Sequence, residues 1–121
     1  MHIVILTKSE EPIYEQIYRQ ISSSILSGEL ISDYCLPSIR QLAKDLQVGV
    51  ITVKKAYEIL ENDGFIYTVL GKGCFVKNLT DKKLEQKKLL IAKEKLEKGL
   101  PLFKELGISK NQLLSLIEKL Y

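Results

Sequence analysis

Two short stretches of the chain carry the side chains best suited to binding a polyanion. Arg40 lies in the first stretch, and Thr52, Lys54 and Lys55 lie in the second. Arg and Lys donate charge-assisted hydrogen bonds to phosphate oxygens, and Arg, Lys and Thr can also hydrogen-bond the base edges exposed in a DNA groove. The chemistry that these residues favour is recognition of nucleic acid.

Residues for catalysis or metal binding are scarce. His2 is the only histidine and lies at the end of the chain, where it gives no plausible Ser-His-acid arrangement. Cys35 and Cys74 are the only cysteines, and two thiols with one histidine do not make a zinc site. We expect a protein that is not an enzyme and that uses no metal or cofactor.

The two stretches have the spacing of amphipathic helices. Apolar residues recur at i, i+3, i+4 and i+7 in each. The segment Gln47-Val48-Gly49 between them is too short for anything except a turn. Two short helices joined in this way predict a helix-turn-helix whose second helix exposes Thr and Lys. The two stripes are Ile39, Leu42, Ala43 and Leu46, then Val53, Ala56, Tyr57 and Leu60.

Further elements flank the helix-turn-helix. Isoleucines at every fourth position from 13 to 25 predict a helix that ends at Gly28. Residues 2–6 are β-branched and apolar, which indicates a short strand. The runs 65–70 and 74–77 predict a β-hairpin, joined through the glycine-rich tip Gly71-Lys72-Gly73. Three helices followed by a hairpin is the order of a winged helix.

The composition shifts to Lys, Glu and Leu after Asn78. A helix is expected over 81–98, broken by Gly99 and Pro101, followed by a helix that Ser109 and Gln112 begin as a capping box. We therefore divide the chain into a DNA-binding domain over 1–78 and a tail over 79–121. Two short helices cannot bury both faces alone, so their apolar stripes are predicted to dimerise or to pack on the rest of the chain: Leu89, Ala92, Leu96, Leu113, Leu116, Ile117 and Leu120.

Bulk charge gives little support for nucleic acid. The net charge is +3, but residues 1–78 hold eight Lys and Arg against nine Asp and Glu, and the excess lies in the tail. No apolar run is long enough to span a membrane and no secretion signal precedes the first helix. We expect a cytoplasmic protein in which Cys35 and Cys74 are free thiols.

The motifs in their joint order resemble the GntR family of winged-helix transcription regulators. The resemblance covers about 65 residues from Pro12 to Val76. Its most specific segment is Leu36-Pro37-Ser38-Ile39-Arg40 with Leu42-Ala43. The other matching segments are Pro12-Ile13-Tyr14-Glu15-Gln16-Ile17, Ser27-Gly28-Glu29-Leu30, Thr52-Val53-Lys54-Lys55-Ala56-Tyr57, Leu60, Gly64 and Gly71-Lys72-Gly73-Cys74-Phe75-Val76.

The short tail resembles that of the YtrA-like branch. This resemblance implies a bacterial homodimeric repressor, joined through its tail and often linked to transporter operons, that binds a palindromic operator in double-stranded DNA. The chain departs from the family where the second helix of the motif begins. Gly49 and Val50 stand where the family commonly has Ser or Thr followed by Arg, so apolar base readout, or none, is expected at that position.

Each candidate DNA contact has a simpler structural alternative. Arg40 either meets DNA or forms a surface salt bridge with Asp45 or Glu61. Ser38 either binds phosphate or only begins a helix. Ile51 either contacts a thymine methyl group or packs under the wing, and Val50 belongs either to the core or to the DNA-facing surface.

The candidates of the second helix and of the hairpin tip have different expected roles. Thr52 and Lys54 are the preferred base or phosphate contacts, whereas Lys55 is expected to be a solvated or phosphate-steering charge. Gly71 and Gly73 either make a tight turn only or also bring the backbone close to DNA, with Lys72 on a phosphate or in the minor groove.

Two other functions compete with operator binding. Winged helices also serve as protein-docking modules, and the nearly neutral head gives this alternative weight. A small-molecule effector site between the tail helices of a dimer would add ligand sensing to DNA binding rather than replace it.

Overall fold

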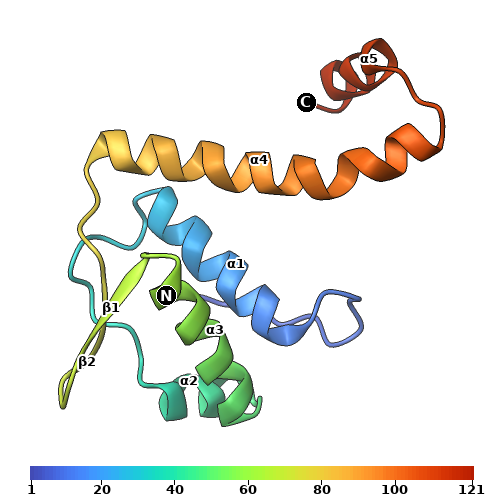
Figure 1. Cartoon of the computed structure of the whole chain (residues 1–121). Coiled ribbons are helices and arrows are strands. Elements are labelled where there is room, and N and C mark those ends of the chain that lie inside the picture. The colour runs from blue at the N-terminus through green and yellow to red at the C-terminus, as the bar shows by residue number, and fades with distance from the viewer. The chain divides into compact units, whose positions relative to one another are not determined.

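The computed structural model describes residues 1–121 and contains five helices and one two-stranded hairpin (Figure 1). Packing separates the chain into a head, Met1–Thr80, and a tail, Asp81–Tyr121. The elements are α1 (Ile13–Leu26), α2 (Ile39–Leu46), α3 (Val50–Asn62), β1 (Ile66–Val69), β2 (Gly73–Val76), α4 (Asp81–Glu105) and α5 (Lys110–Leu120). The expected winged helix-turn-helix with a helical tail, mostly α with a small hairpin, is confirmed.

The core of the head lies where α1 and α2 pack against α3. Ile17 and Ile21 of α1 and Val53 and Leu60 of α3 are fully buried. Each comes from the apolar stripe of its helix, because side chains three and four positions apart lie on one helical face. The same stripes add Ile25, Ala56 and Tyr57 to the core. The remaining core side chains come from α2, from the connector between α1 and α2 (residues 27–38), and from the wing and the residue before it: Leu30, Leu36, Leu42, Ala43, Phe65, Ile66 and Val76.

The wing is held to the head by the connector that precedes α2. β1 and β2 pair antiparallel with Ile66 opposite Val76, and Cys35 adds one bridge opposite Phe75. Leu36 N–H donates to the carbonyl of Cys74 at 2.9 Å, and Val76 N–H donates to the carbonyl of Tyr34 at 2.9 Å. The connector thus pairs with the outer edge of β2 and holds the wing beside the start of α2. Both cysteines are free thiols, as predicted.

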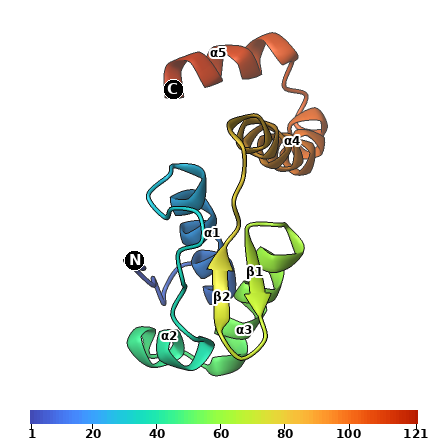
Figure 2. The ribbon, with the colours of Figure 1, turned by 90° about the vertical axis from the view of Figure 1, so that its left-hand side faces the viewer.

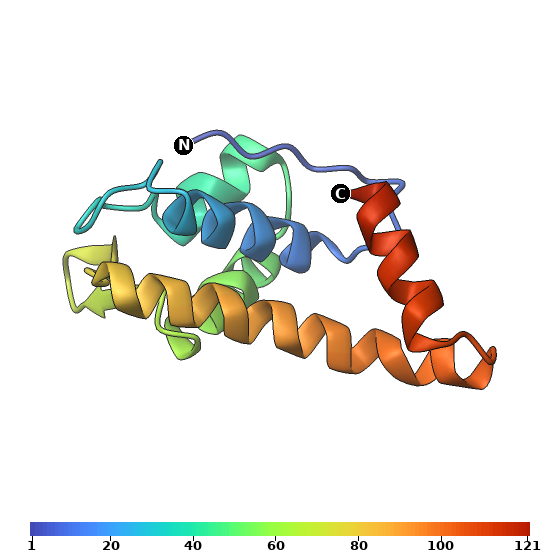
Figure 3. The same cartoon turned by 90° about the horizontal axis from the view of Figure 1, so that it is seen from above.

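The predicted strand over residues 2–6 does not form. The segment is extended, but its partners are glutamine side chains of α1. The side-chain amide of Gln16 exchanges hydrogen bonds with the N–H and carbonyl of Leu6, and that of Gln20 does the same with Val4. Residues two apart in an extended chain and four apart in a helix advance by nearly equal distances, about 6–7 Å. The arm therefore runs alongside α1 (Figure 3) without a strand partner.

The predicted break at Gly99 and Pro101 is wrong. α4 continues through both residues to Glu105. Pro101 removes only one helical hydrogen bond, that to the carbonyl of Glu97. The helix is terminated instead by Gly107, which lies two residues after its end and has a φ of +73°. Its N–H donates to Lys104 and that of Ile108 donates to Phe103, which is the Schellman pattern. α5 then begins with the predicted capping box of Ser109 and Gln112.

Candidate nucleic-acid interface

α2, the first turn of α3 and the tip of the wing lie at one end of the head (Figure 2). We call this surface the recognition face. The sequence-predicted residues that it collects are Ser38, Arg40, Ile51, Thr52, Lys54, Gly71, Lys72 and Gly73. Because they come from three separate elements, their convergence is a property of the fold and is not visible in the sequence alone.

Arg40 is exposed in the first turn of α2. Neither of the carboxylates proposed as alternative partners pairs with it. Asp45 accepts a hydrogen bond from the side chain of Gln41 at 2.7 Å, and Glu61 accepts one from Thr68 at 2.8 Å. The guanidinium is consequently available to an external anion. The ion pairs of the head join Arg19 to Glu11 and Lys54 to Glu58.

Ser38 is the N-cap of α2. Its hydroxyl oxygen accepts a hydrogen bond from the backbone N–H of Gln41 at 3.1 Å, the geometry that satisfies a helix donor which lacks an intrahelical partner. Ser38 therefore begins the helix, as one of its two predicted roles requires. Because the residue is also exposed, the hydroxyl proton can still be donated to a phosphate oxygen.

The first turn of α3 presents apolar side chains to solvent. Ile51 is 82% exposed and Val50 is 47% exposed. Packing of Ile51 under the wing is thus excluded, and Val50 does not belong to the core. Thr52 is half-buried beside them. Gly49 is the N-cap and supplies no side-chain hydrogen bond, so the turn begins without a polar side chain.

The two lysines of α3 differ in their surroundings. Lys54 lies 4.0 Å from Glu58 one turn further along the helix, and both side chains are exposed. Such a surface pair is weak and yields readily to a stronger anion. The ammonium of Lys55, in contrast, lies 4.0 Å from the ring centroid of Tyr14 on α1. This cation–π contact directs Lys55 toward α1, so Lys54 is the better candidate for contact with DNA.

The tip of the wing requires its glycines. Gly71 has a φ of +78° in a turn closed by a hydrogen bond of 2.9 Å from Lys72 N–H to the carbonyl of Val69. A positive φ at the third position of such a turn favours glycine strongly. Gly73 follows with a φ of +122°. The side chains left at the tip are Lys72 and Leu70, and Leu70 is 97% exposed.

Two tyrosines outside the recognition face hydrogen-bond the connector that precedes α2. Tyr57 donates a hydrogen bond to the carbonyl of Pro37 at 2.7 Å, and burial raises the pKa of its hydroxyl. Tyr67 donates to Asp33 at 2.7 Å, and this hydrogen bond raises the pKa of Tyr67. Both hydroxyls therefore stay protonated at neutral pH and keep donating. Neither bond could be predicted from the sequence, because its two partners are 20 and 34 residues apart along the chain.

The arrangement of helix-turn-helix and wing agrees with comparison to known proteins. The model of the family described as bacterial regulatory proteins, gntR family, matches residues 13–76, which include α1 to β2. The chain belongs to the GntR family. Members of this family are DNA-binding transcription regulators rather than enzymes.

Relatives of this GntR-family chain match the tail as well as the head. The HTH-type transcriptional repressor YtrA of Bacillus subtilis is 37% identical over 90 residues, which are 74% of this chain and 69% of that protein. The crystal structure of a transcriptional antiterminator from Listeria monocytogenes EGD-e has a TM-score of 0.76 at 37% identity, covering 98% of this chain and 89% of the other.

A third comparison concerns DNA. The DNA-binding domain of AraR, in complex with operator ORX1, has a TM-score of 0.56 and 31% identity, covering 63% of this chain and 98% of the other. A winged helix of this family thus binds operator DNA in that protein.

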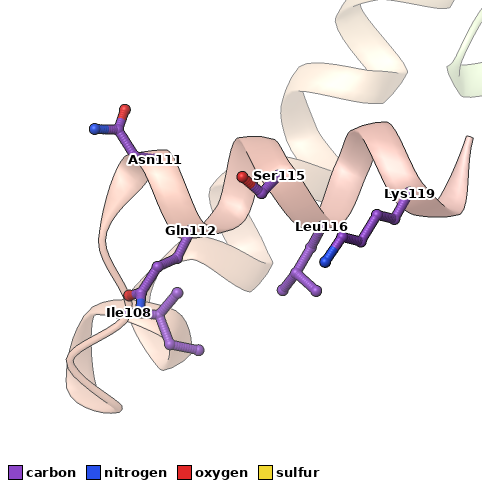
Figure 4. Close-up of a pocket in the computed structure, with 6 residues that line it drawn as sticks. All are labelled: Ile108, Asn111, Gln112, Ser115, Leu116 and Lys119. Carbon is purple, nitrogen blue, oxygen red and sulfur yellow. The ribbon is translucent and has the colours of Figure 1, made fainter.

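The tail of the GntR-family chain buries none of its residues. Six of the seven predicted dimerisation residues are exposed and the seventh, Leu113, is half-buried. An open pocket on α5, lined by Ile108, Asn111, Gln112, Ser115, Leu116 and Lys119, lies beside this stripe (Figure 4). None of the five helices of the chain combines the length and apolar character needed to cross a membrane.

Proposed function

We propose that the chain is a homodimeric, sequence-specific repressor that acts in the cytoplasm on its own operon or on a transporter operon. Each head binds one half of a palindromic operator. The first turn of α3 enters the major groove, and the wing lies alongside with Lys72 on a phosphate or in the minor groove. Ser38, Arg40, Ile51, Thr52, Lys54 and the tip Gly71-Lys72-Gly73 supply the contacts, whereas Lys55, whose ammonium lies over the ring of Tyr14, adds only long-range attraction to phosphate.

The exposed guanidinium of Arg40 is the observation that carries this proposal. Arg40 belongs to α2, which lies at the same end of the head as the first turn of α3 and the tip of the wing. The two carboxylates considered as its partners, Asp45 and Glu61, are engaged by Gln41 and Thr68. An arginine left without a carboxylate partner on a winged helix suits a phosphate or a guanine edge. The operator complexes of AraR support the same use of the fold.

Dimerisation through the tail is supported by its exposed apolar surface. Leu96, Leu116 and Ile117 are about half exposed, and Leu89 and Leu120 more so. A soluble monomer rarely exposes apolar side chains in such continuity. Packing of Leu89, Ala92, Leu96, Leu113, Leu116, Ile117 and Leu120 against a second copy would remove them from water and set the spacing of the two heads.

Selection of genomic fragments tests the proposal. The purified chain is mixed with fragmented DNA of its own genome at low salt, and the bound fragments are sequenced. The expected result is enrichment of an inverted repeat whose half-site centres lie about 10 base pairs, or a multiple, apart. No enrichment at low salt would contradict operator binding and would favour a protein-docking role, for which the nearly neutral head and the exposed Leu70 are the supporting observations.

A further inference from the structure

The first turn of α3 carries two neighbouring apolar side chains that the head leaves exposed. Ile51 is 82% exposed and Val50 is 47% exposed, and Gly49 before them has no side chain. A Cβ atom added to Gly49 would meet only the Thr52 hydroxyl, at 3.7 Å. The first turn of α3 therefore presents an apolar surface formed by Val50 and Ile51.

Cations precede and follow this apolar surface along the chain. Arg40 lies before it on α2, and Lys54 lies after it on α3. A single exposed apolar residue needs no explanation. Two in succession, on the turn that enters the major groove in a helix-turn-helix and flanked by phosphate-binding side chains, do need one. A partner that is anionic at its edges and apolar at its centre matches this surface.

The floor of the major groove offers such a partner. Phosphates line its rims, and the apolar group that unmodified bases expose there is the C5 methyl group of thymine. Val50 and Ile51 carry no donor or acceptor on their side chains, so they cannot read the hydrogen-bonding edge of guanine or adenine. The apolar contact that they can make with a base edge in the groove is with the methyl group of thymine.

We infer that Val50 and Ile51 read thymine methyl groups in each half of the operator. Specificity at the start of α3 then comes from apolar contact, whereas Arg40 and Lys54 position the helix on the backbone. The inference rests on the proposed function, because it specifies how the same surface recognises its operator.

Deoxyuridine substitution tests this inference directly, since it removes only the methyl group of thymine. An operator fragment obtained by selection is prepared as a series in which one thymine position in both half-sites is replaced at a time. Burying one methyl group less should weaken binding about four-fold for each half-site. At least one position should show this loss with the wild-type chain, as measured by fluorescence anisotropy.

Alanine variants test whether Val50 and Ile51 cause the loss of affinity for the deoxyuridine operator. With Val50→Ala/Ile51→Ala, the same deoxyuridine operator should bind as well as the thymine operator, because the partner of the methyl group is gone. Ile31→Ala is the matched control: Ile31 is 69% exposed in the connector, and its truncation should leave the deoxyuridine effect unchanged.

The outcomes separate the two proposals. Equal affinity for thymine and deoxyuridine at every position, or an undiminished deoxyuridine effect in the double variant, overturns methyl readout while leaving operator binding intact. A chain that selects no DNA fragment overturns the proposed function and methyl readout together.

Discussion

The hydroxyl of Tyr57 on α3 donates a hydrogen bond of 2.7 Å to the carbonyl oxygen of Pro37, next to the N-cap of α2. This bond joins the middle of one helix of the helix-turn-helix to the start of the other. The position of Arg40 relative to Ile51 therefore depends on it. Tyr57 is 3% exposed, so the bond is shielded from competing water.

Tyr57→Phe should weaken the head without unfolding it. The ring stays in the core, but the carbonyl of Pro37 loses its partner, and such a loss costs about 1–2 kcal/mol. Urea unfolding measures the change in the free energy of unfolding, and operator affinity should fall as well. Tyr67→Phe, which removes the exposed bond to Asp33, serves as the control and should change stability less. An unchanged midpoint for Tyr57→Phe would contradict the role given to this bond.

The same residue predicts a dependence of stability on pH. Burial raises the pKa of Tyr57 above its ordinary value of 10.0, so the folded state holds this proton more tightly than the unfolded state. Its contribution is therefore complete below pH 10 and falls as the pH rises further. The free energy of unfolding should decline more steeply above pH 10 in the wild type than in Tyr57→Phe. Parallel declines would mean that the hydroxyl is not buried.

Loss of the Arg40 side chain should make operator affinity less dependent on salt concentration. Each phosphate contact that is removed lowers the slope of log affinity against log salt by about one. We expect this change for Arg40→Ala, measured with an operator fragment between low and moderate salt. Arg19→Ala is the charge-matched control, because Arg19 of α1 pairs with Glu11, and its slope should equal that of the wild type. Equal slopes for both variants would place Arg40 away from the phosphates.

The helix-turn-helix and the wing could be predicted because their signals are local. The apolar period of α2 and α3 and the glycines at 71 and 73 each specify structure within a few residues. The exposure of Val50 could not be predicted, because it lies three residues before Val53 and thus fits the buried stripe equally well. Only the packing of α3 in the folded head decides which side of the first turn faces solvent.

Gln16→Leu should release the arm that precedes α1. Gln16 is 1% exposed and bonds the backbone of Leu6 at 2.8 and 3.0 Å. Leucine fills a similar volume but leaves those backbone groups without partners, which costs about 1–3 kcal/mol. The amide of Leu6 should exchange with deuterium much faster in the variant. Gln20→Leu, which affects Val4 instead, is the control, and unchanged protection of Leu6 in Gln16→Leu would rule out this clamp.

The arm and the end of α4 show where sequence patterns fail. A run of β-branched residues predicts a strand, but it does not show that glutamine amides will replace a neighbouring strand. Gly99 and Pro101 have the composition of a helix stop, yet the Schellman geometry belongs to Gly107. Both differences arise from contacts that a period of apolar residues does not encode.

Leu116→Asp should separate the dimer. A carboxylate buried in the proposed interface would lose its hydration without a partner, which is unfavourable by several kcal/mol. Sedimentation velocity should show a dimer for the wild type and a monomer for this variant. Asn111→Asp places the same group on the side of α5 opposite Leu113 and should leave the dimer intact. A variant Leu116→Asp that remains dimeric would move the interface away from this stripe.

The operator affinity of Arg40→Ala/Lys54→Ala at low salt tests most directly whether the recognition face binds DNA. Fluorescence anisotropy with a selected genomic operator gives the affinity, and sedimentation verifies that the variant remains a dimer. We predict that specific binding is abolished while the dimer and the helical content are unchanged. Wild-type affinity in the double variant would show that the recognition face does not bind DNA.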